Sequence, residues 1–280
     1  MMEDRTPERP VLHSYKVDLI LGRGGTGTVY RGFDKKGNVF AIKRFHENFF
    51  RNQLHLRDLK KSVKRFRKLK HQNVVQIMDF IDARGEDGNC MVMEYMDGPN
   101  LKDYILKRPW NFQERLGIVQ QICLGLQYLH ENGITHHDFK PANVLFTRQG
   151  LAKLSDFSLY GSSLLFELFD RGAGDQVTPI FVAPEIIRKE KIGPPMDQYS
   201  LGITMYMMFA ERPPFMVDSL QKLYRCHLTV IPDNPSDINP KCPPELSQII
   251  MKLLAKYPDK RFRDCYELRW VYANVSRRSI

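Results

Sequence analysis

The sequence predicts an α+β fold with two lobes, a small β-rich lobe followed by a larger helical lobe. Three observations indicate this architecture. Short β-prone runs separated by turn residues dominate the first hundred residues, and apolar residues at helical spacing dominate the remainder. A short link at residues 96–99 separates the two patterns. The length of 280 residues and a hydrophobic content of 42% allow such a chain to bury a large core.

The strands of the first lobe are predicted from β-branched and aromatic runs that turn residues interrupt. A glycine cluster follows the first run, and Asp34–Asn38 is a turn signal before the third. We expect strands at residues 17–21, 28–30, 39–43, 74–81 and 90–95.

Residues 51–70 combine a helical period with an excess of positive charge. Four apolar residues recur there at steps of three and four: Leu56, Leu59, Val63 and Phe66. The same segment holds nine lysines and arginines and a single acid, Asp58, in a chain with a formal net charge of +10. Such a run is either a solvated helix face or a contact surface for an acidic or phosphorylated partner or an anionic surface. No nucleic-acid-binding motif accompanies the charge, so nucleic acid is not expected.

Helices are predicted for most of the chain after residue 100. Residues 112–132 form a long apolar-periodic segment that Gly133 closes, and residues 201–209 are almost wholly apolar, as expected of a buried helix. Residues 162–177 have no clean period and predict a mobile loop.

Composition and the N-terminal residues exclude several classes of protein. No apolar run approaches the ~18 residues that a membrane-spanning helix needs. The polar, proline-bearing start is not a secretory signal. The five cysteines are scattered and form no CxxC pair, which favours reduced thiols over disulfides or a zinc site and indicates a cytoplasmic protein.

The segment Gly22–Val29, GRGGTGTV, matches the pattern G-x-G-x-x-G-x-V at every fixed position. β-Prone residues follow its last glycine, so we expect a hairpin and not the start of a dinucleotide-binding helix. Such a hairpin is either a flexible tip or a loop whose backbone N–H groups lie close over phosphates. Lys43, 16 residues after Gly27, ends a predicted strand where it is either a surface lysine or a cation that neutralises those phosphates.

A second group of polar residues lies in the segments HHDFKPAN and LSDFS. Asp138 is placed to accept the proton of a hydroxyl group, and Lys140 to steady a transferred phosphoryl group. Asn143 and Asp156 lie 13 residues apart across a predicted strand hairpin. Their amide and carboxylate oxygens are hard ligands of the kind that Mg²⁺ prefers. These residues therefore predict phosphate chemistry that depends on magnesium.

Two further segments, VAPE at 182–185 and MDQYSLG at 196–202, complete an ordered series. From residue 14 to about residue 275, the sequence resembles the eukaryotic-type protein kinases in the order and spacing of these motifs. KPAN with Lys140, and Thr178 ahead of the APE segment, are similar to the serine/threonine branch. The resemblance implies transfer of the γ-phosphoryl group of ATP to serine or threonine hydroxyls of a protein substrate, with Mg²⁺ as cofactor.

The resemblance also implies roles for individual residues. It makes Asp138, Lys140 and Lys43 catalytic, and Asn143 and Asp156 ligands of the metal. The residues that it places against ATP are Leu21, Gly22, Gly24, Gly25, Gly27, Val29, Ala41, Lys43, Met93, Glu94, Met96, Asn100 and Leu145.

Within that set, Met93 would be the gatekeeper, and the backbones of Glu94 and Met96 would meet adenine. Outside it, Glu185 and Arg261 would form a buried ion pair, and Asp197 would anchor the loop that carries Asp138. The implied division is an N-terminal extension at 1–13, a nucleotide-binding N-lobe at 14–96, and a catalytic and substrate-binding C-lobe at 97–280, together one protein kinase domain.

The sequence departs from the family pattern at three positions. His137 replaces an arginine that receives an activation-loop phosphate, which predicts loss of that control but not of the chemistry. Ser158 replaces the glycine of DFG, which should bias that loop between states. The helix glutamate that pairs with the strand lysine would fall at Ser62, and the nearby acid Asp58 could substitute only if the helix shifts. This third departure leaves open a pseudokinase that binds nucleotide and acts as a scaffold or allosteric regulator.

Overall fold

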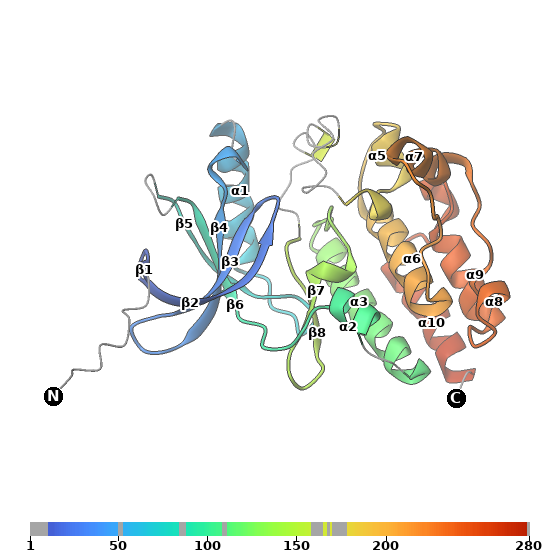
Figure 1. Ribbon diagram of the computed structural model, residues 1–280, viewed down its shortest axis with the longest axis horizontal. Coiled ribbons are helices and arrows are strands. Elements are labelled where there is room, and N and C mark those ends of the chain that lie inside the picture. The colour runs from blue at the N-terminus through green and yellow to red at the C-terminus, as the bar shows by residue number, and fades with distance from the viewer. Residues whose placement is uncertain are drawn as a thin grey trace. The chain divides into compact units, whose positions relative to one another are not determined.

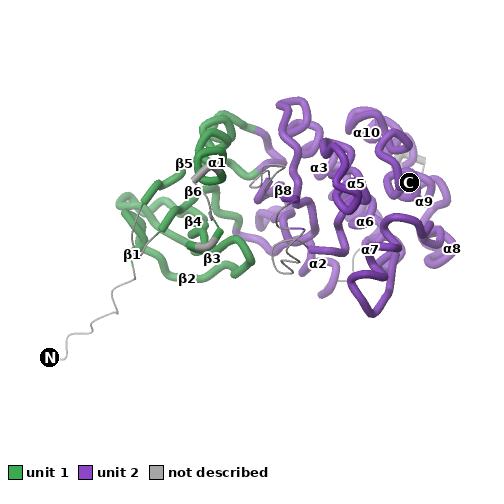
Figure 2. Tube along the Cα trace, turned by 90° about the horizontal axis from the view of Figure 1, so that it is seen from above, with its two compact units in different colours: residues 1–70, 75–96 green, residues 71–74, 97–280 purple. Residues whose placement is uncertain are grey.

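The chain forms two compact units, residues 1–70 with 75–96 and residues 71–74 with 97–280 (Figure 2). The computed structural model describes residues 11–49, 53–83, 88–107, 111–157, 165–166, 169 and 178–278. Ser158 and most of the segment expected as a mobile loop at 162–177 lie outside the described residues. The described residues of that segment, Leu165, Phe166 and Phe169, are helical.

The first unit is built on a six-stranded antiparallel sheet with the strand order β1-β2-β3-β4-β6-β5 (Figure 1). Its strands are β1 (Val11–Leu12), β2 (Tyr15–Gly24), β3 (Gly27–Phe33), β4 (Val39–Phe45), β5 (Ile77–Ile81) and β6 (Cys90–Glu94). The turn expected at Asp34–Asn38 joins β3 to β4, and the amide N–H of Asp34 donates to the carbonyl oxygen of Asn38 over 3.1 Å. Because β1 pairs with β2, the sheet begins before residue 14, within the segment expected as an extension.

The strand expected at 74–81 is shorter than predicted. Only Ile77–Ile81 forms β5, whereas Val74 makes an isolated parallel bridge with Leu154 in the second unit. The amide N–H of Leu154 donates to the carbonyl oxygen of Asn73 over 2.9 Å, and the Asn73 side chain donates to the carbonyl oxygen of Ala152 over 2.8 Å. These bonds hold residues 71–74 in the second unit, which the local pattern of apolar residues does not reveal.

One long helix, α1 (Gln53–Phe66), accompanies the sheet of the first unit and packs against β5 (Figure 1). Its apolar residues at helical spacing are buried: Leu59, Val63 and Phe66 are 3%, 2% and 2% exposed. The short 3₁₀ helix Glu47–Phe49 links β4 to the segment that precedes α1. The helical period of residues 51–70 therefore predicts both the helix and the face that it buries.

The second unit is mainly helical. Its helices are α2 (Leu101–Lys107), α3 (Phe112–Glu131), α5 (Pro184–Ile187), α6 (Pro194–Ala210), α7 (Leu220–Thr229), α8 (Pro235–Ile238), α9 (Pro244–Leu253) and α10 (Cys265–Arg278). A two-stranded hairpin, β7 (Val144–Phe146) with β8 (Ala152–Leu154), packs against α3. Short 3₁₀ helices lie at Pro141–Asn143, Pro179–Phe181 and Pro258–Lys260. In the part of the chain that the structure describes, no helix combines the length and apolarity needed to cross a bilayer.

Two long helices form the core of the second unit. A capping box begins α3, because the Asn111 side chain accepts from the Glu114 N–H over 2.7 Å and the Glu114 carboxylate accepts from the Asn111 N–H over 3.3 Å. Gly133, with φ of 64°, follows its end as expected. Helix α6 extends well beyond the predicted 201–209 and packs against α3, α8 and α9. At Gly202 a Cβ would lie 2.8 Å from the Cβ of Leu253, so this glycine permits close packing of α6 on α9.

Candidate active site

The glycine segment forms the tip of the β2–β3 hairpin. Gly22 pairs with Val29 and Gly24 with Gly27 across the two strands. A Cβ added at Gly22 or Gly24 would meet no protein atom within 4 Å, whereas at Gly27 it would lie 2.2 Å from the carbonyl oxygen of Arg44. Gly27 is therefore required by the sheet itself. Gly22 and Gly24 are not, and the open space at their Cα atoms suits the close approach of a ligand.

Several residues expected to contact a nucleotide share one face of the sheet. Val29 lies opposite Lys43 in the β3–β4 pairing, and Ala41 lies opposite Met93 in the β4–β6 pairing. Because Ala41 and Lys43 are two residues apart on one strand, all four side chains project from the same face. Lys43 is only 4% exposed, so the alternative of a surface lysine is wrong.

Of the two residues whose backbones are predicted to meet adenine, Glu94 is the last residue of β6 and Met96 lies two residues beyond it. The amide N–H of Glu94 donates to the carbonyl oxygen of Gln76 over 2.9 Å, and the Glu94 carboxylate accepts from the amide N–H of Gln76 over 3.1 Å. Asn100, which is also predicted to contact the nucleotide, lies in the second unit. Its side-chain oxygen accepts from the Asp103 N–H over 2.9 Å and so caps the start of α2.

Helix α1 presents no acid on its buried face. Ser62, where the family glutamate was expected, is half-buried, and Asp58 is exposed. The helix therefore does not turn Asp58 inward in place of the missing glutamate. At the position of α1 where the family pattern expects a carboxylate, the chain carries the hydroxyl of Ser62.

In the second unit, two residues predicted to be catalytic, Asp138 and Lys140, converge with a predicted metal ligand, Asn143. The Lys140 ammonium lies 2.8 Å from Asp138 Oδ2 and 3.0 Å from Oδ1. The Asn143 amide donates to Asp138 Oδ2 over 3.1 Å and to the Asp138 carbonyl oxygen over 2.8 Å. These charge-assisted contacts fix the carboxylate of Asp138, which is only partly buried and so remains accessible to a substrate hydroxyl.

Asn143 is tied in turn to the segment that carries Asp156. The carbonyl oxygen of Asn143 accepts from the Ser155 N–H over 2.9 Å and from the Ser155 hydroxyl over 3.1 Å. Asp156 follows directly, with a left-handed φ of 56°. A non-glycine residue in this conformation is uncommon, and such residues cluster at functional sites.

These residues fit magnesium better than a transition metal. Within the described residues, no group of three or more His, Cys, Asp or Glu side chains could hold a metal ion. Asn143 and Asp156 offer an amide oxygen and a carboxylate, and Mg²⁺ usually takes one or two protein oxygens and completes its shell with phosphate and water. The donor set therefore suits an ion that arrives with a phosphate ligand.

The loop that carries Asp138 is anchored from α6 by Asp197. Its carboxylate accepts from the backbone N–H of His136 over 2.7 Å and of His137 over 3.1 Å, and it lies 2.7 Å from His130 Nε2. Burial lowers the pKa of His130, but hydrogen bonds with Asp197 and Cys265 outweigh burial and raise that pKa to about 10. Burial raises the pKa of Asp197, yet the contact with His130 leaves it lowered overall. The pair is therefore an imidazolium and a carboxylate, and it holds the loop with a full charge.

A second buried histidine, His136, connects this loop to the segment after β8. Its ring makes edge-to-face contacts with Phe139 and Phe157, at centroid distances of 5.7 and 6.3 Å. Burial lowers the pKa of His136, so the ring is neutral and packs as an aromatic residue. His137 beside it adopts a left-handed φ of 68°, which turns the chain between the anchored backbone and Asp138.

A small cavity of about 30 Å³ adjoins Asp138. Among its lining residues are His137, Asp138, Leu165, Thr178 and Phe181. Thr178 and Asp138 therefore line the same cavity. Leu165 is 3% exposed and supplies part of an apolar wall beside the carboxylate of Asp138.

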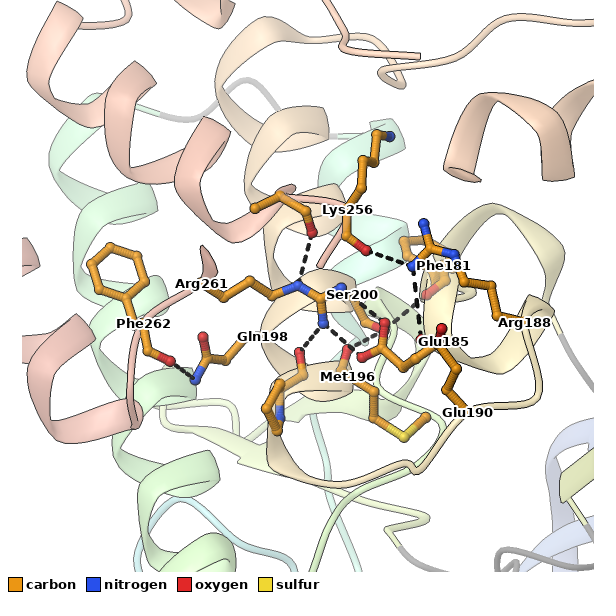
Figure 3. A network of polar contacts seen from close by, with 12 residues as sticks. Phe181, Glu185, Arg188, Glu190, Met196, Gln198, Ser200, Lys256, Arg261 and Phe262 are labelled. Carbon is orange, nitrogen blue, oxygen red and sulfur yellow. Dashed lines mark hydrogen bonds and ion pairs between the residues drawn. The ribbon is translucent and has the colours of Figure 1, made fainter. Parts of the chain in front are cut away.

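A polar network supports the chain that follows this cavity (Figure 3). Arg261 makes two parallel bonds of 2.6 and 2.8 Å to the carboxylate of Glu185, and both side chains are almost fully buried. Arg261 also donates to the carbonyl oxygens of Ala255 and Pro195 over 3.0 and 2.8 Å. The Ser200 hydroxyl donates to the carbonyl oxygen of Phe181 over 2.8 Å. The expected ion pair is thus present and fastens residues 181–185 to α6.

The predicted residues fall into two sets, one in each unit. Val29, Ala41, Lys43 and Met93 share a face in the first unit, and Asp138, Lys140 and Asn143 meet in the second. Sequence reasoning missed His130 and Ser155, which hold the catalytic set in place. No sequence signal marks His130, because its partner Asp197 lies 67 residues away. Ser155 could have been suspected only from its position directly before Asp156.

Comparison with known proteins identifies relatives over nearly the whole chain. The family model described as protein kinase domain matches residues 15–271. A probable serine/threonine-protein kinase of Streptomyces coelicolor is 32% identical over 91% of this chain and 39% of its own length. The serine/threonine-protein kinase PknB of Mycobacterium leprae is 28% identical over 91% of this chain and 42% of its own length. The chain thus spans about two fifths of these relatives.

Among solved structures, the kinase domain of PknI from Mycobacterium tuberculosis superposes with a TM-score of 0.74. The match covers 97% of this chain and 98% of that domain, at 22% sequence identity. At this identity the match establishes the fold.

Proposed function

Because the chain belongs to the protein kinase family, in its serine/threonine branch, we propose that it transfers the γ-phosphoryl group of ATP to serine or threonine hydroxyls of a protein substrate. The observation that carries the proposal is the convergence of Asp138, Lys140 and Asn143 around one fixed carboxylate. A loop without catalytic activity would not need these three side chains around one carboxylate.

The proposed mechanism assigns one step to each residue. The glycine hairpin and Lys43 bind the phosphates of ATP. Asn143 and Asp156 would hold Mg²⁺, which would neutralise negative charge on those phosphates. Asp138 orients the acceptor hydroxyl and accepts its proton as the oxygen bonds to the γ-phosphorus and ADP leaves. Lys140, bonded to Asp138, stabilises the negative charge on the phosphoryl group in transfer.

Residues 14–96 are proposed to bind the nucleotide and residues 97–280 to carry catalysis and substrate binding. A cytoplasmic location is proposed as well, and the five free cysteines support it. The partners are a protein substrate and, at the basic residues 51–70, an acidic or phosphorylated protein.

The test is transfer of labelled phosphate from ATP, with Mg²⁺, to the protein itself, to casein and to a basic protein. Asp138→Asn should lower transfer by at least about 100-fold and leave ATP binding nearly unchanged, because the carboxylate acts on the acceptor hydroxyl. Asp218→Asn, at an exposed carboxylate paired with Lys222, is the matched control and should transfer at the wild-type rate. Equal transfer by Asp138→Asn would refute the role of Asp138.

One observation favours the alternative function. The face of α1 that packs on the sheet carries Ser62 where the family has glutamate, and Asp58 is exposed. Absence of labelled product from a folded wild-type protein that binds ATP would identify the chain as a pseudokinase.

A further inference from the structure

The outer face of α1 carries a row of cations whose charges the described fold does not neutralise. At about 100° per residue, Arg57, Lys61, Lys64 and Lys68 fall within an arc of about 60°. The buried Leu59, Val63 and Phe66 lie on the opposite side of the helix. All four cations are exposed. Lys68 follows the helix end, where the Lys68 N–H donates to the Arg65 carbonyl oxygen over 3.1 Å. We call these four residues the basic stripe.

The structure neutralises Lys60 and Arg67 of this region but not the basic stripe. Lys60 pairs with Asp82, and Arg67 pairs with Asp79 at 3.0 Å. Asp79 lies in β5 and Asp82 directly follows it, so both acids are on the side of α1 that faces the edge of the sheet. Across the ranges that the structure describes, none of the four stripe residues forms an ion pair. Asp58 is the single acid of the segment 51–70.

This arrangement differs from an ordinary solvated helix face, which mixes both signs of charge. Arg57, Lys61, Lys64 and Lys68 follow one another at steps of three and four residues, the spacing at which like charges repel and destabilise a helix. Asp58, three residues before Lys61, offsets part of that repulsion, and α1 carries no other acid to offset the rest. An external group with negative charges at matching intervals would do so.

We propose that the basic stripe is a docking site for an acidic segment of another protein, with carboxylates at steps of three and four residues along a helix. The stripe is one helix wide and about 16 Å long, from the 1.5 Å rise per residue. On a helix, Cβ atoms three or four residues apart are about 5–6 Å apart, so the stripe residues within α1 and the carboxylate residues of a partner helix repeat at the same interval. Length, width and charge spacing therefore all match one acidic helix.

Two other anionic partners fit the stripe less well. Membrane-surface helices bury an apolar face in lipid, but the apolar face of α1 is occupied by the sheet. Single-stranded nucleic acid binds through aromatic side chains that stack on bases, and α1 has no aromatic residue on its exposed side. Both remain outcomes that the experiment distinguishes.

The inference deepens the partner named under the proposed function, and its test uses no phosphotransfer. Binding of a fluorescein-labelled helical peptide, with glutamates at steps of four, three and four, is measured by fluorescence anisotropy on the full chain. A second peptide of the same composition has its glutamates spread around the helix. The first should bind at least about fivefold more tightly, because only its carboxylates meet the stripe in register.

The informative variant is Lys61→Glu with Lys64→Glu. It should retain the helix, because glutamate at 61 would face Arg57 and Arg65 at favourable spacing. It should bind the first peptide about tenfold more weakly than wild type. The matched control is Lys35→Glu with Lys36→Glu, two exposed lysines in the β3–β4 turn that give the same change in net charge. It should bind within about twofold of wild type.

Three results would overturn the proposal. Equal weakening by the two double variants would mean that net charge alone attracts the peptide. Unchanged binding by the stripe variant would place the contact elsewhere. Tighter stripe-dependent binding of phosphatidylserine vesicles or of a single-stranded oligonucleotide would identify a membrane or a nucleic acid as the partner.

Discussion

Asp197→Asn tests whether the buried pair of His130 and Asp197 holds the catalytic loop through charge. The substitution keeps the size of the side chain and removes its charge. The side chain then offers one oxygen to three donors: the backbone N–H groups of His136 and His137 and the ring of His130. In the wild-type protein these donors lie 2.7–3.1 Å from the carboxylate oxygens of Asp197. An amide N–H₂ must then face at least one of those donors.

The expected loss of stability follows from two estimates. Removing one partner of a buried charge pair typically costs about 3–5 kcal/mol. The rise of the His130 pKa from 6.5 to about 10 corresponds to about 5 kcal/mol at about 1.4 kcal/mol per unit. The lowered pKa of Asp197 reflects the same contact and is not added. We expect the free energy of unfolding to fall by about 3–5 kcal/mol at pH 6.

The pH dependence has a definite sign. Because the folded-state pKa of His130 is raised, its stabilisation is fully present below about pH 6.5 and is lost as the pH rises through about 10. Asp197, with a lowered pKa, stays ionised over this whole range. The difference in stability between wild type and Asp197→Asn should therefore be largest near pH 6 and shrink steadily towards pH 10.

Urea unfolding followed by circular dichroism at several pH values measures this difference. Asp233→Asn is the matched control, because Asp233 pairs with Arg212 at 3.0 Å on an exposed surface, where an ion pair contributes at most about 1 kcal/mol. A stability difference for Asp197→Asn that is no larger than that of the control, or that stays constant from pH 6 to 10, would refute the reasoning.

Four further predictions concern the predicted site residues of the two units. Gly24→Ala should weaken ATP binding about tenfold and change the free energy of unfolding by less than about 1 kcal/mol, since its Cβ would meet no protein atom. Gly27→Ala should instead destabilise the fold by about 1–3 kcal/mol, because its Cβ would lie 2.2 Å from a backbone oxygen of β4. Thermal unfolding measures the stability of the two glycine variants, and nucleotide titration measures their affinity for ATP. Ser62→Glu should raise kcat/KM severalfold by adding the missing acid. Lys61→Glu, on the exposed face of α1, is the control. No gain in kcat/KM for Ser62→Glu would show that the chain does not need the acid. Finally, because His137 replaces the arginine that would receive a phosphate, phosphatase treatment of the protein should leave its rate within about twofold, and loss of activity would contradict this.

The sequence predicted local features with good accuracy because local interactions decide them. Turn residues and alternating β-prone runs located the hairpin that holds Gly22–Gly27, and the apolar period of residues 51–70 located α1 and its buried face. The capping pair Asn111 and Glu114 shows why α3 begins where its apolar period begins. Such features depend on residues a few positions apart, whose contacts follow from helix or strand geometry alone.

Other features depended on residues that are distant in sequence. Nothing in the local pattern assigns residues 71–74 to the second unit. The backbone hydrogen bond between Asn73 and Leu154 joins residues that are far apart in the sequence. Asn100 was singled out as a nucleotide contact, and only the structure shows that its side chain also caps α2. The difference between Gly24 and Gly27 emerged only when the distance to the neighbouring strand was known.

The sequence by itself determined the family, the order of the two lobes and the identity of the groups able to carry phosphate chemistry, since motif spacing and residue type are properties of the chain. Tertiary structure decided which of those groups meet and in which ionic state. His130 is a cation because folding buries it against Asp197 and Cys265, and Lys43 is buried because β4 lies inside a sheet. Asp58 is exposed because the apolar residues of α1 set the rotation of the helix. Burial and long-range pairing control these outcomes, and both arise only when distant segments pack together.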